Sequence, residues 1–236
     1  MNLIFDIGAN LGLFTEACLT TFPGCRVVAV EANPNLINEL HKRFRDYNVI
    51  LLNELVGTVM GEEAPFYICS GDTLSTAKKK WTTHSRFAGQ RRYDASGNDV
   101  HSWMNQGLTM ECVNLDWLVS KYGSPDLIKI DVEGYELEVL RGLSTRQGRI
   151  CFEFCEEFFD ETEAACNHLQ SIGYSEFSFT CGGESGRLLR RDYPVLPPGT
   201  ESSPPESSYR SWGECDELRK GIVPDRKILW GNIWVR

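Results

Sequence analysis

A turn that contains two glycines, at residues 6–12, is the feature that most constrains how this chain folds. It follows the apolar run 3–5 and reads D-x-G-x-x-x-G, with Asp6 ending the expected strand and Gly8 and Gly12 in the turn. Glycine has no Cβ, so the turn can be tight and a ligand can approach the backbone closely. A helix that begins near Gly12 would offer unpaired N–H groups to a polar ligand. The sequence therefore predicts a strand–turn–helix unit that binds a ligand at its turn.

The spacing of this turn bears on the kind of ligand. Dinucleotide-binding turns use G-x-G-x-x-G, which brings the backbone up against a pyrophosphate. Asn10 stands where that pattern has glycine, and this favours a ligand without a pyrophosphate, such as S-adenosylmethionine. A second apolar strand ends in Glu31, where an acid accepts hydrogen bonds from ribose hydroxyls. The alternative is a purely structural turn, and two acids at the tips of consecutive strands argue against it.

Composition indicates a single soluble domain over residues 1–236. The chain is 42% hydrophobic and 24% charged, which is ordinary for a globular protein of this size. Its formal net charge of −9 argues against a general polyanion binder, although residues 78–80 and 91–92 are local basic runs. No apolar run approaches the length of a membrane span.

Cysteine usage and the position of the first strand suggest a compartment. The nine cysteines include no C-x-x-C pair and their number is odd, so neither a zinc site nor a complete disulfide framework is expected. Several lie in or beside expected strands, where a free thiol behaves as a small hydrophobic group. Reduced cysteines and a first strand that leaves no room for a signal peptide predict a cytoplasmic protein. The sequence does not indicate an oligomeric state.

Strand and helix patterns alternate along the chain, which is typical of a doubly wound parallel sheet. Periodicity fades at about 70–109 and 181–226, which we expect to be insertions within the one domain. The first is either a lid or binding loop or a solvated loop, and the second is a long, partly mobile excursion. Strands are expected at 2–6, 26–31, 48–52, 64–69, 110–113, 126–131, 149–154, 176–179 and 227–235, and helices at 12–22, 35–45, 115–122, 135–143 and 161–172.

Three stretches carry a resemblance to a known family. They are residues 5–12 (FDIGANLG), 30–34 (VEANP) and, most specifically, 128–142 (IKIDVEGYELEVLRG). In these the chain resembles the FkbM family of S-adenosylmethionine-dependent methyltransferases over roughly residues 2–180. The resemblance implies an α/β, class I methyltransferase (Rossmann-like) fold, a doubly wound seven-stranded sheet with an antiparallel final strand. It also implies methyl transfer to oxygen, frequently on sugars or secondary metabolites.

The class I strand order would place the strand ending at Asp131 next to the strand that carries Glu153, about 4.8 Å away. Two carboxylates so close either share a proton or hold a divalent cation, Mg²⁺ or Mn²⁺. An acceptor alcohol needs such a base or metal beside it. Lys129 lies deeper in the strand and needs a carboxylate partner, Asp131 or Glu153. The expected catalytic residues are therefore Asp131, Lys129 and Glu153, with Asp131 and Glu153 as metal ligands.

Other roles for these side chains stay open. For Glu133 we favour capping of the following helix, and for Asp131 we favour the active site. Glu153 is either a metal ligand or an ion-pair partner, and Glu156-Glu157 could add a ligand. His84 and His101, in the first insertion, are secondary candidates for a base.

A larger set is expected to bind the cofactor. The first turn would hold its amino-acid moiety, Glu31 its ribose, and the segments at 53–54 and 75–76 its adenine or rim. The set comprises Asp6, Gly8, Ala9, Asn10, Gly12, Thr15, Glu31, Ala32, Asn53, Glu54, Ser75 and Thr76.

These expectations predict an S-adenosylmethionine-dependent O-methyltransferase that acts on a sugar or glycan hydroxyl, with or without a divalent metal. One alternative is a nucleic-acid methyltransferase that grips its substrate with the basic insertion, against which the acidic net charge weighs. Others are a small secondary metabolite as acceptor, or a non-catalytic module that binds S-adenosylmethionine or a nucleotide.

Overall fold

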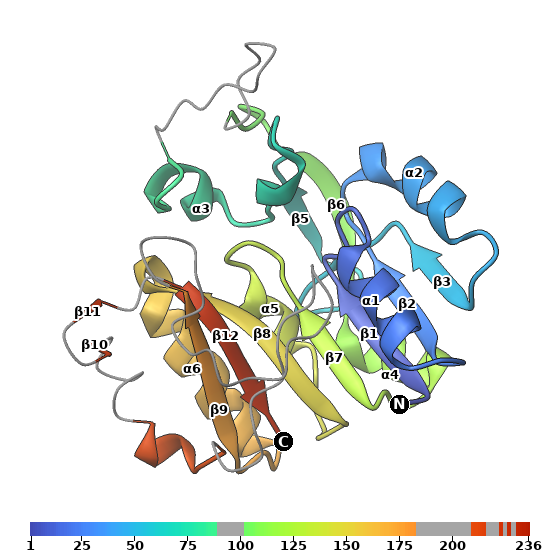
Figure 1. Cartoon of the computed structure of the whole chain (residues 1–236). Coiled ribbons are helices and arrows are strands. Elements are labelled where there is room, and N and C mark those ends of the chain that lie inside the picture. Colours follow the sequence, from blue (N-terminus) through green and yellow to red (C-terminus); the bar gives the residue numbers. More distant parts are fainter. Residues whose placement is uncertain (89–101, 183–208, 216–221, 224–225, 228–229) are drawn as a thin grey trace.

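The computed structural model describes residues 1–88, 102–182, 209–215, 222–223, 226–227 and 230–236 (Figure 1). His101, the basic pair at 91–92 and most of the second predicted insertion lie outside these residues. The fold is α/β, as predicted, and its main sheet has seven strands. These strands are β1 (Leu3–Ile7), β2 (Arg26–Val30), β3 (Val49–Leu52), β7 (Leu127–Ile130), β8 (Arg149–Cys155), β9 (Phe177–Gly182) and β12 (Trp230–Val235).

The strand order of this sheet is β3-β2-β1-β7-β8-β12-β9. Neighbouring strands from β3 to β8 are parallel, and β12 runs antiparallel to both β8 and β9, which confirms the predicted antiparallel final strand. Every residue of β1 and β7 is buried, as near-continuous apolar strands are when helices cover both faces of a sheet. The order reverses between β1 and β7, and ligands of open α/β sheets bind at such a crevice.

Helices cover both faces of the sheet. Apolar residues of α1 and α2 pack on one face, and those of α4, α5 and α6 pack on the other. In α2 the buried residues Leu36, Leu40 and Phe44 repeat every four positions, and the Asn33 side chain caps its first turn by accepting from the N–H of Asn35. The helices are α1 (Leu13–Thr21), α2 (Pro34–Phe44), α3 (Lys79–His84), α4 (Leu115–Tyr122), α5 (Glu136–Arg141) and α6 (Phe159–Ser171).

A second, three-stranded sheet stands at the carboxyl end of the first, in the order β4-β6-β5 (Figure 1). Its strands are β4 (Leu55–Val56), β5 (Glu63–Phe66) and β6 (Leu108–Val113). Short 3-10 turns occur at Asp72–Leu74, Glu156–Phe158 and Trp212–Glu214, and β10 (Ile222–Val223) pairs with β11 (Arg226–Lys227). None of the helices among the described residues has the length and apolar composition that crossing a bilayer requires.

The described part of the first predicted insertion is folded and docked. The Arg86 guanidinium donates two hydrogen bonds to the Glu157 carboxylate in a bidentate ion pair, Nε to Oε1 at 2.9 Å and Nη2 to Oε2 at 2.7 Å. The ring of Trp81, on α3, stacks on Phe158 with centroids 5.7 Å apart. Lys78 bonds Glu138 at 3.2 Å, and its ammonium also contacts Glu161. Over residues 72–88, therefore, the reading as a solvated loop is wrong.

Candidate active site

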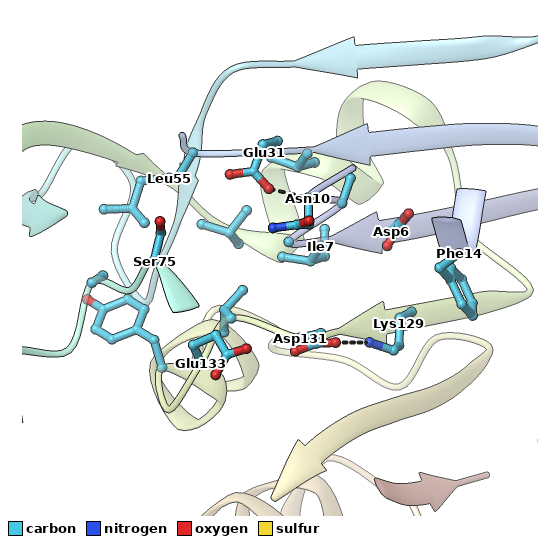
Figure 2. Close-up of a pocket in the computed structure, with 18 of the residues that line it drawn as sticks. Asp6, Ile7, Asn10, Phe14, Glu31, Leu55, Ser75, Lys129, Asp131 and Glu133 are labelled. Carbon is cyan, nitrogen blue, oxygen red and sulfur yellow. Dashed lines mark hydrogen bonds and ion pairs between the residues drawn. The ribbon is translucent and has the colours of Figure 1, made fainter. Parts of the chain in front are cut away.

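A cavity of about 230 Å³ lies at the crevice between β1 and β7. Its walls come from the ends of β1, β2 and β7, from β4, and from residues 73–77, so the docked segment closes one side (Figure 2). Five carboxylates line it. Among the described residues of its wall, one side chain is basic, that of Lys129. The carboxylates are those of Asp6, Glu31, Glu54, Asp131 and Glu133.

Two glycines shape the first turn in different ways. Gly8 has φ +81°, and a Cβ there would lie 1.9 Å from the carbonyl oxygen of Asp131, so the turn packs directly on the end of β7. Gly12 has φ +79°, but its Cβ would meet the ring of Phe44 at 2.4 Å. Gly8 therefore lines the cavity, whereas Gly12 permits the contact between this turn and α2.

The N–H groups of the turn are bonded within the protein. Those of Gly8 and Ala9 both donate to the carbonyl of Val30, at 2.9 and 3.0 Å. Those of residues 10, 11 and 12 donate to the Glu31 carboxylate, the Asn10 side chain and the Ala9 carbonyl. The N–H groups of residues 8–12 are therefore not available to a ligand, and the prediction that the helix beginning near Gly12 offers its first N–H groups stays a prediction. A ligand meets carboxylate oxygens here, which accept hydrogen bonds and attract positive charge.

Glu31 is held rigidly at the end of β2. Its Oε2 accepts from the N–H of Asn10 at 2.7 Å and its Oε1 from the N–H of Asn33 at 2.6 Å. Burial raises the pKa of the Glu31 carboxyl despite these two bonds. A carboxylate has about four lone-pair sites, so each oxygen of Glu31 can accept one more hydrogen bond from a ligand in the cavity. Asn53 bonds the backbone carbonyls of Glu31 and Ala32 with its amide nitrogen, at 2.8 and 3.2 Å.

Asp6 and Lys129 are register partners on neighbouring strands. Asp6 accepts a 2.6 Å hydrogen bond from the hydroxyl of Thr15, which is fully buried. The Lys129 ammonium lies 2.9 Å from Oδ2 of Asp131 and 5.7 Å from the centre of the Phe14 ring (Figure 2). Lys129 is 3% exposed, so its charge requires a carboxylate partner, and of the two that were predicted, Asp131 and Glu153, the bond is to Asp131.

Three carboxylates gather where β7 and β8 end. One oxygen from each of Asp131, Glu133 and Glu153 lies within 4.8 Å of the others, which confirms that Asp131 and Glu153 are neighbours. Burial, and then the charge of Asp131, raises the pKa of both Glu133 and Glu153 well above the ordinary value. Such a group of oxygens can share protons or hold a hard cation.

Among the described residues no side chain caps α5, so the predicted capping of this helix by Glu133 is wrong. Glu136, rather than Glu133, accepts from the N–H groups of Val132 at 3.1 Å and Gly134 at 3.2 Å. Burial raises the pKa of Glu136 to about 7. Glu133 adopts φ +55° and its carboxylate faces the cavity (Figure 2). The role favoured for Glu133 from the sequence is therefore corrected.

Most residues of the predicted set line the cavity, and five do not. Gly12, Thr15, Asn53 and Thr76 support the wall from behind; the Thr76 hydroxyl, for example, donates to the Glu133 carbonyl at 2.8 Å. Glu153 lines a smaller adjoining pocket. The residues that do line it are Asp6, Gly8, Ala9, Asn10, Glu31, Ala32, Glu54, Ser75, Lys129 and Asp131.

Sequence reasoning missed the apolar part of the wall. Leu11 and Leu13 are 41% and 48% exposed beside the turn, and leucines flanking a glycine turn were a usable signal. Phe66 and Tyr135 reach the cavity from distant segments, and no local pattern marks them. The complete cavity thus combines an apolar wall with an acidic floor.

The comparisons with known proteins agree with this geometry. The family described as the Methyltransferase FkbM domain matches residues 6–176. The hexuronic acid methyltransferase AglP of Haloferax volcanii is 25% identical over 158 residues, which cover 66% of this chain and 55% of that protein. The chain therefore spans about half the length of this curated relative.

Solved structures with a similar fold are more distant. The precorrin-6y C5,15-methyltransferase of Geobacter metallireducens is 12% identical, with a TM-score of 0.42 over 100% of this chain and 78% of that one. An S-adenosylmethionine-dependent O-methyltransferase of Thermotoga maritima is 11% identical, with a TM-score of 0.40 over 99% and 58% of the two chains.

Proposed function

Because the chain belongs to the FkbM family, and is thus an S-adenosylmethionine-dependent methyltransferase, we propose that it methylates a hydroxyl oxygen of a sugar or glycan. The Haloferax volcanii relative is a hexuronic acid methyltransferase by name, which supports a carbohydrate acceptor for this chain. Small secondary metabolites that carry a hydroxyl are the alternative acceptors. The acidic cavity and the net charge of −9 weigh against a nucleic acid.

The observation that carries this proposal is the polarity of the cavity wall. The turn at residues 8–12 has its N–H groups bonded internally, while five carboxylates face the cavity. Such a wall suits the sulfonium, ammonium and ribose hydroxyls of S-adenosylmethionine and repels a pyrophosphate. Glu31, whose two oxygens are fixed by backbone donors, is proposed to accept from the ribose.

Bound S-adenosylmethionine supplies a methyl carbon that an acceptor oxygen attacks as the carbon–sulfur bond breaks. Holding the two reactants in line is worth on the order of 7–11 kcal/mol, so positioning is the main contribution of the protein. The acceptor hydroxyl must also lose its proton, and Asp131 and Glu133 both face the cavity. We assign the base to Asp131, which Lys129 orients through the 2.9 Å bond.

The test uses the purified chain and two readouts. Calorimetry measures S-adenosylmethionine binding, and mass spectrometry of a panel of neutral sugars, hexuronic acids and phenols locates the added methyl group. The expected result is methyl on oxygen of a sugar, with turnover lost in Asp131→Asn and kept in Glu39→Gln, an exposed carboxylate on α2. Transfer to nitrogen or carbon, or full turnover in Asp131→Asn, contradicts the proposal.

A further inference from the structure

The strand next to the acidic cluster at the end of β7 and β8 carries a further buried side-chain oxygen, that of Asn232. Asn232, on β12, lies directly opposite Glu153 in the antiparallel pair of β12 and β8. Directly opposed residues share one face of a sheet, with Cβ atoms about 4.5–5.5 Å apart. Asn232 is 2% exposed, and among the described residues its side-chain oxygen has no hydrogen-bond partner.

Strand alternation puts this oxygen on the same face as the other members of the cluster. Lys129 of β7 is the register partner of Cys151 on β8. Residues two apart on a strand share a face, so Asp131 stays with Lys129 and Glu153 stays with Cys151. Asn232 therefore points into the same layer as Asp131 and Glu153. A buried amide oxygen left unpaired destabilises a fold unless a ligand occupies it.

The charges of the cluster are unbalanced. Asp131, Glu133 and Glu153 carry three negative charges when ionised, and Lys129 returns one positive charge through its bond to Asp131. The nearby guanidinium of Arg86 is held by both oxygens of Glu157. For these four side chains, three minus one leaves a net charge of −2 at a partly exposed site, which one divalent cation would neutralise.

We propose that Asp131, Glu133, Glu153 and Asn232 together bind one hard divalent cation, Mg²⁺ or Mn²⁺. All four ligands are oxygens, and carboxylate and carbonyl oxygens are the donors that these ions prefer over imidazole or thiolate. The ion lies at the edge of the proposed methyl-donor cavity, because Asp131 and Glu133 belong to both sites. Its role rests on the proposed function: a cation there lowers the pKa of the acceptor hydroxyl.

Binding is tested without methyl donor or acceptor, so its outcome is independent of the proposed function. Mn²⁺ is titrated into the purified chain, and the free ion is followed by electron paramagnetic resonance. Wild type is expected to bind one Mn²⁺ per chain, and Mg²⁺ is expected to displace it. Glu153→Gln and Asn232→Ala each lower the affinity at least about 10-fold, whereas Glu39→Gln leaves it unchanged.

A variant that adds a negative charge is expected to raise the Mn²⁺ affinity instead of lowering it. Asn232→Asp supplies a fourth carboxylate, so it binds Mn²⁺ more tightly than wild type and gains more thermal stability when Mn²⁺ is added. If Asn232→Asp does not fold, Asn232→Ala alone decides the role of this residue. Absence of Mn²⁺ binding, equal binding by Glu153→Gln, or binding that depends on Glu153 but not on Asn232 overturns the proposal.

Discussion

Replacing Gly8 with alanine tests how the first turn builds the cavity. The residue has φ +81°, a conformation that costs an L-residue roughly 1–2 kcal/mol. The new Cβ would also lie 1.9 Å from the Asp131 carbonyl oxygen, a backbone atom that cannot rotate away. Displacing packed backbone in this way costs about 1–3 kcal/mol more. The expected destabilisation of Gly8→Ala is therefore about 2–5 kcal/mol.

Gly24→Ala is the matched control. Gly24 has φ +85°, and nothing lies within 4 Å of the Cβ that alanine would add. It should lose only the conformational part, about 1–2 kcal/mol, and keep full affinity for S-adenosylmethionine. The difference between the two variants therefore isolates the contact with β7.

Urea denaturation measures the free energy of unfolding of both variants, and thermal melts check it at roughly 2–4 °C per kcal/mol. Calorimetry measures the affinity of the folded protein for S-adenosylmethionine. Gly8→Ala is expected to bind S-adenosylmethionine more weakly than wild type, because the end of β7 and Asp131 must move. If Gly8→Ala costs no more than Gly24→Ala and binds S-adenosylmethionine as tightly as wild type, the reasoning about this turn is refuted.

Three further predictions follow from single side chains. Arg86→Met removes the guanidinium from the half-buried Glu157 carboxylate, which keeps the bond from the N–H of residue 86, and should cost about 1–3 kcal/mol in urea denaturation. Arg86→Lys should recover only part, and no loss would mean that the pair does not dock residues 72–88. Burial raises the pKa of Glu31 above its ordinary 4.5, so donor affinity is full above the raised value and falls as the pH is lowered through it. Calorimetry from about pH 8 to about pH 5 should show this fall, and Glu31→Gln, weaker throughout, should lose that dependence; equal pH dependence in both proteins counts against the assignment. Lys129→Met removes the ammonium that orients Asp131 and should lower kcat about 100-fold while leaving the KM for S-adenosylmethionine near its wild-type value, and a change confined to KM would contradict the role.

Much of the fold was predictable because its signals are local. Each strand of the main sheet is a short apolar run followed by a turn residue, and helix periods separate most of them. The resemblance to the FkbM family supplied the strand order, and with it the proximity of Asp131 and Glu153. Strand alternation put residues 129 and 131 on one face, which narrowed the partner of Lys129 to Asp131 or Glu153.

The errors concern interactions between distant segments. Gly12 matches a ligand-binding pattern, yet its lack of a side chain serves the contact with Phe44, 32 positions later in the chain. Glu133 precedes α5 and was expected to cap it, but its backbone turns with φ +55° and its carboxylate faces the cavity. The docking of residues 72–88 depends on Glu157 and Phe158, whose positions no local pattern near residue 80 reveals.

The central claim is that the crevice between β1 and β7 binds a positively charged donor because its wall presents carboxylates and its turn has no free N–H groups at residues 8–12. Calorimetric titration of the same protein with S-adenosylmethionine and with NAD, which carries a pyrophosphate, tests this most directly. We predict saturable binding of one S-adenosylmethionine per chain, weakened by Glu31→Gln, and no measurable heat from NAD. Tighter binding of NAD than of S-adenosylmethionine would contradict the account.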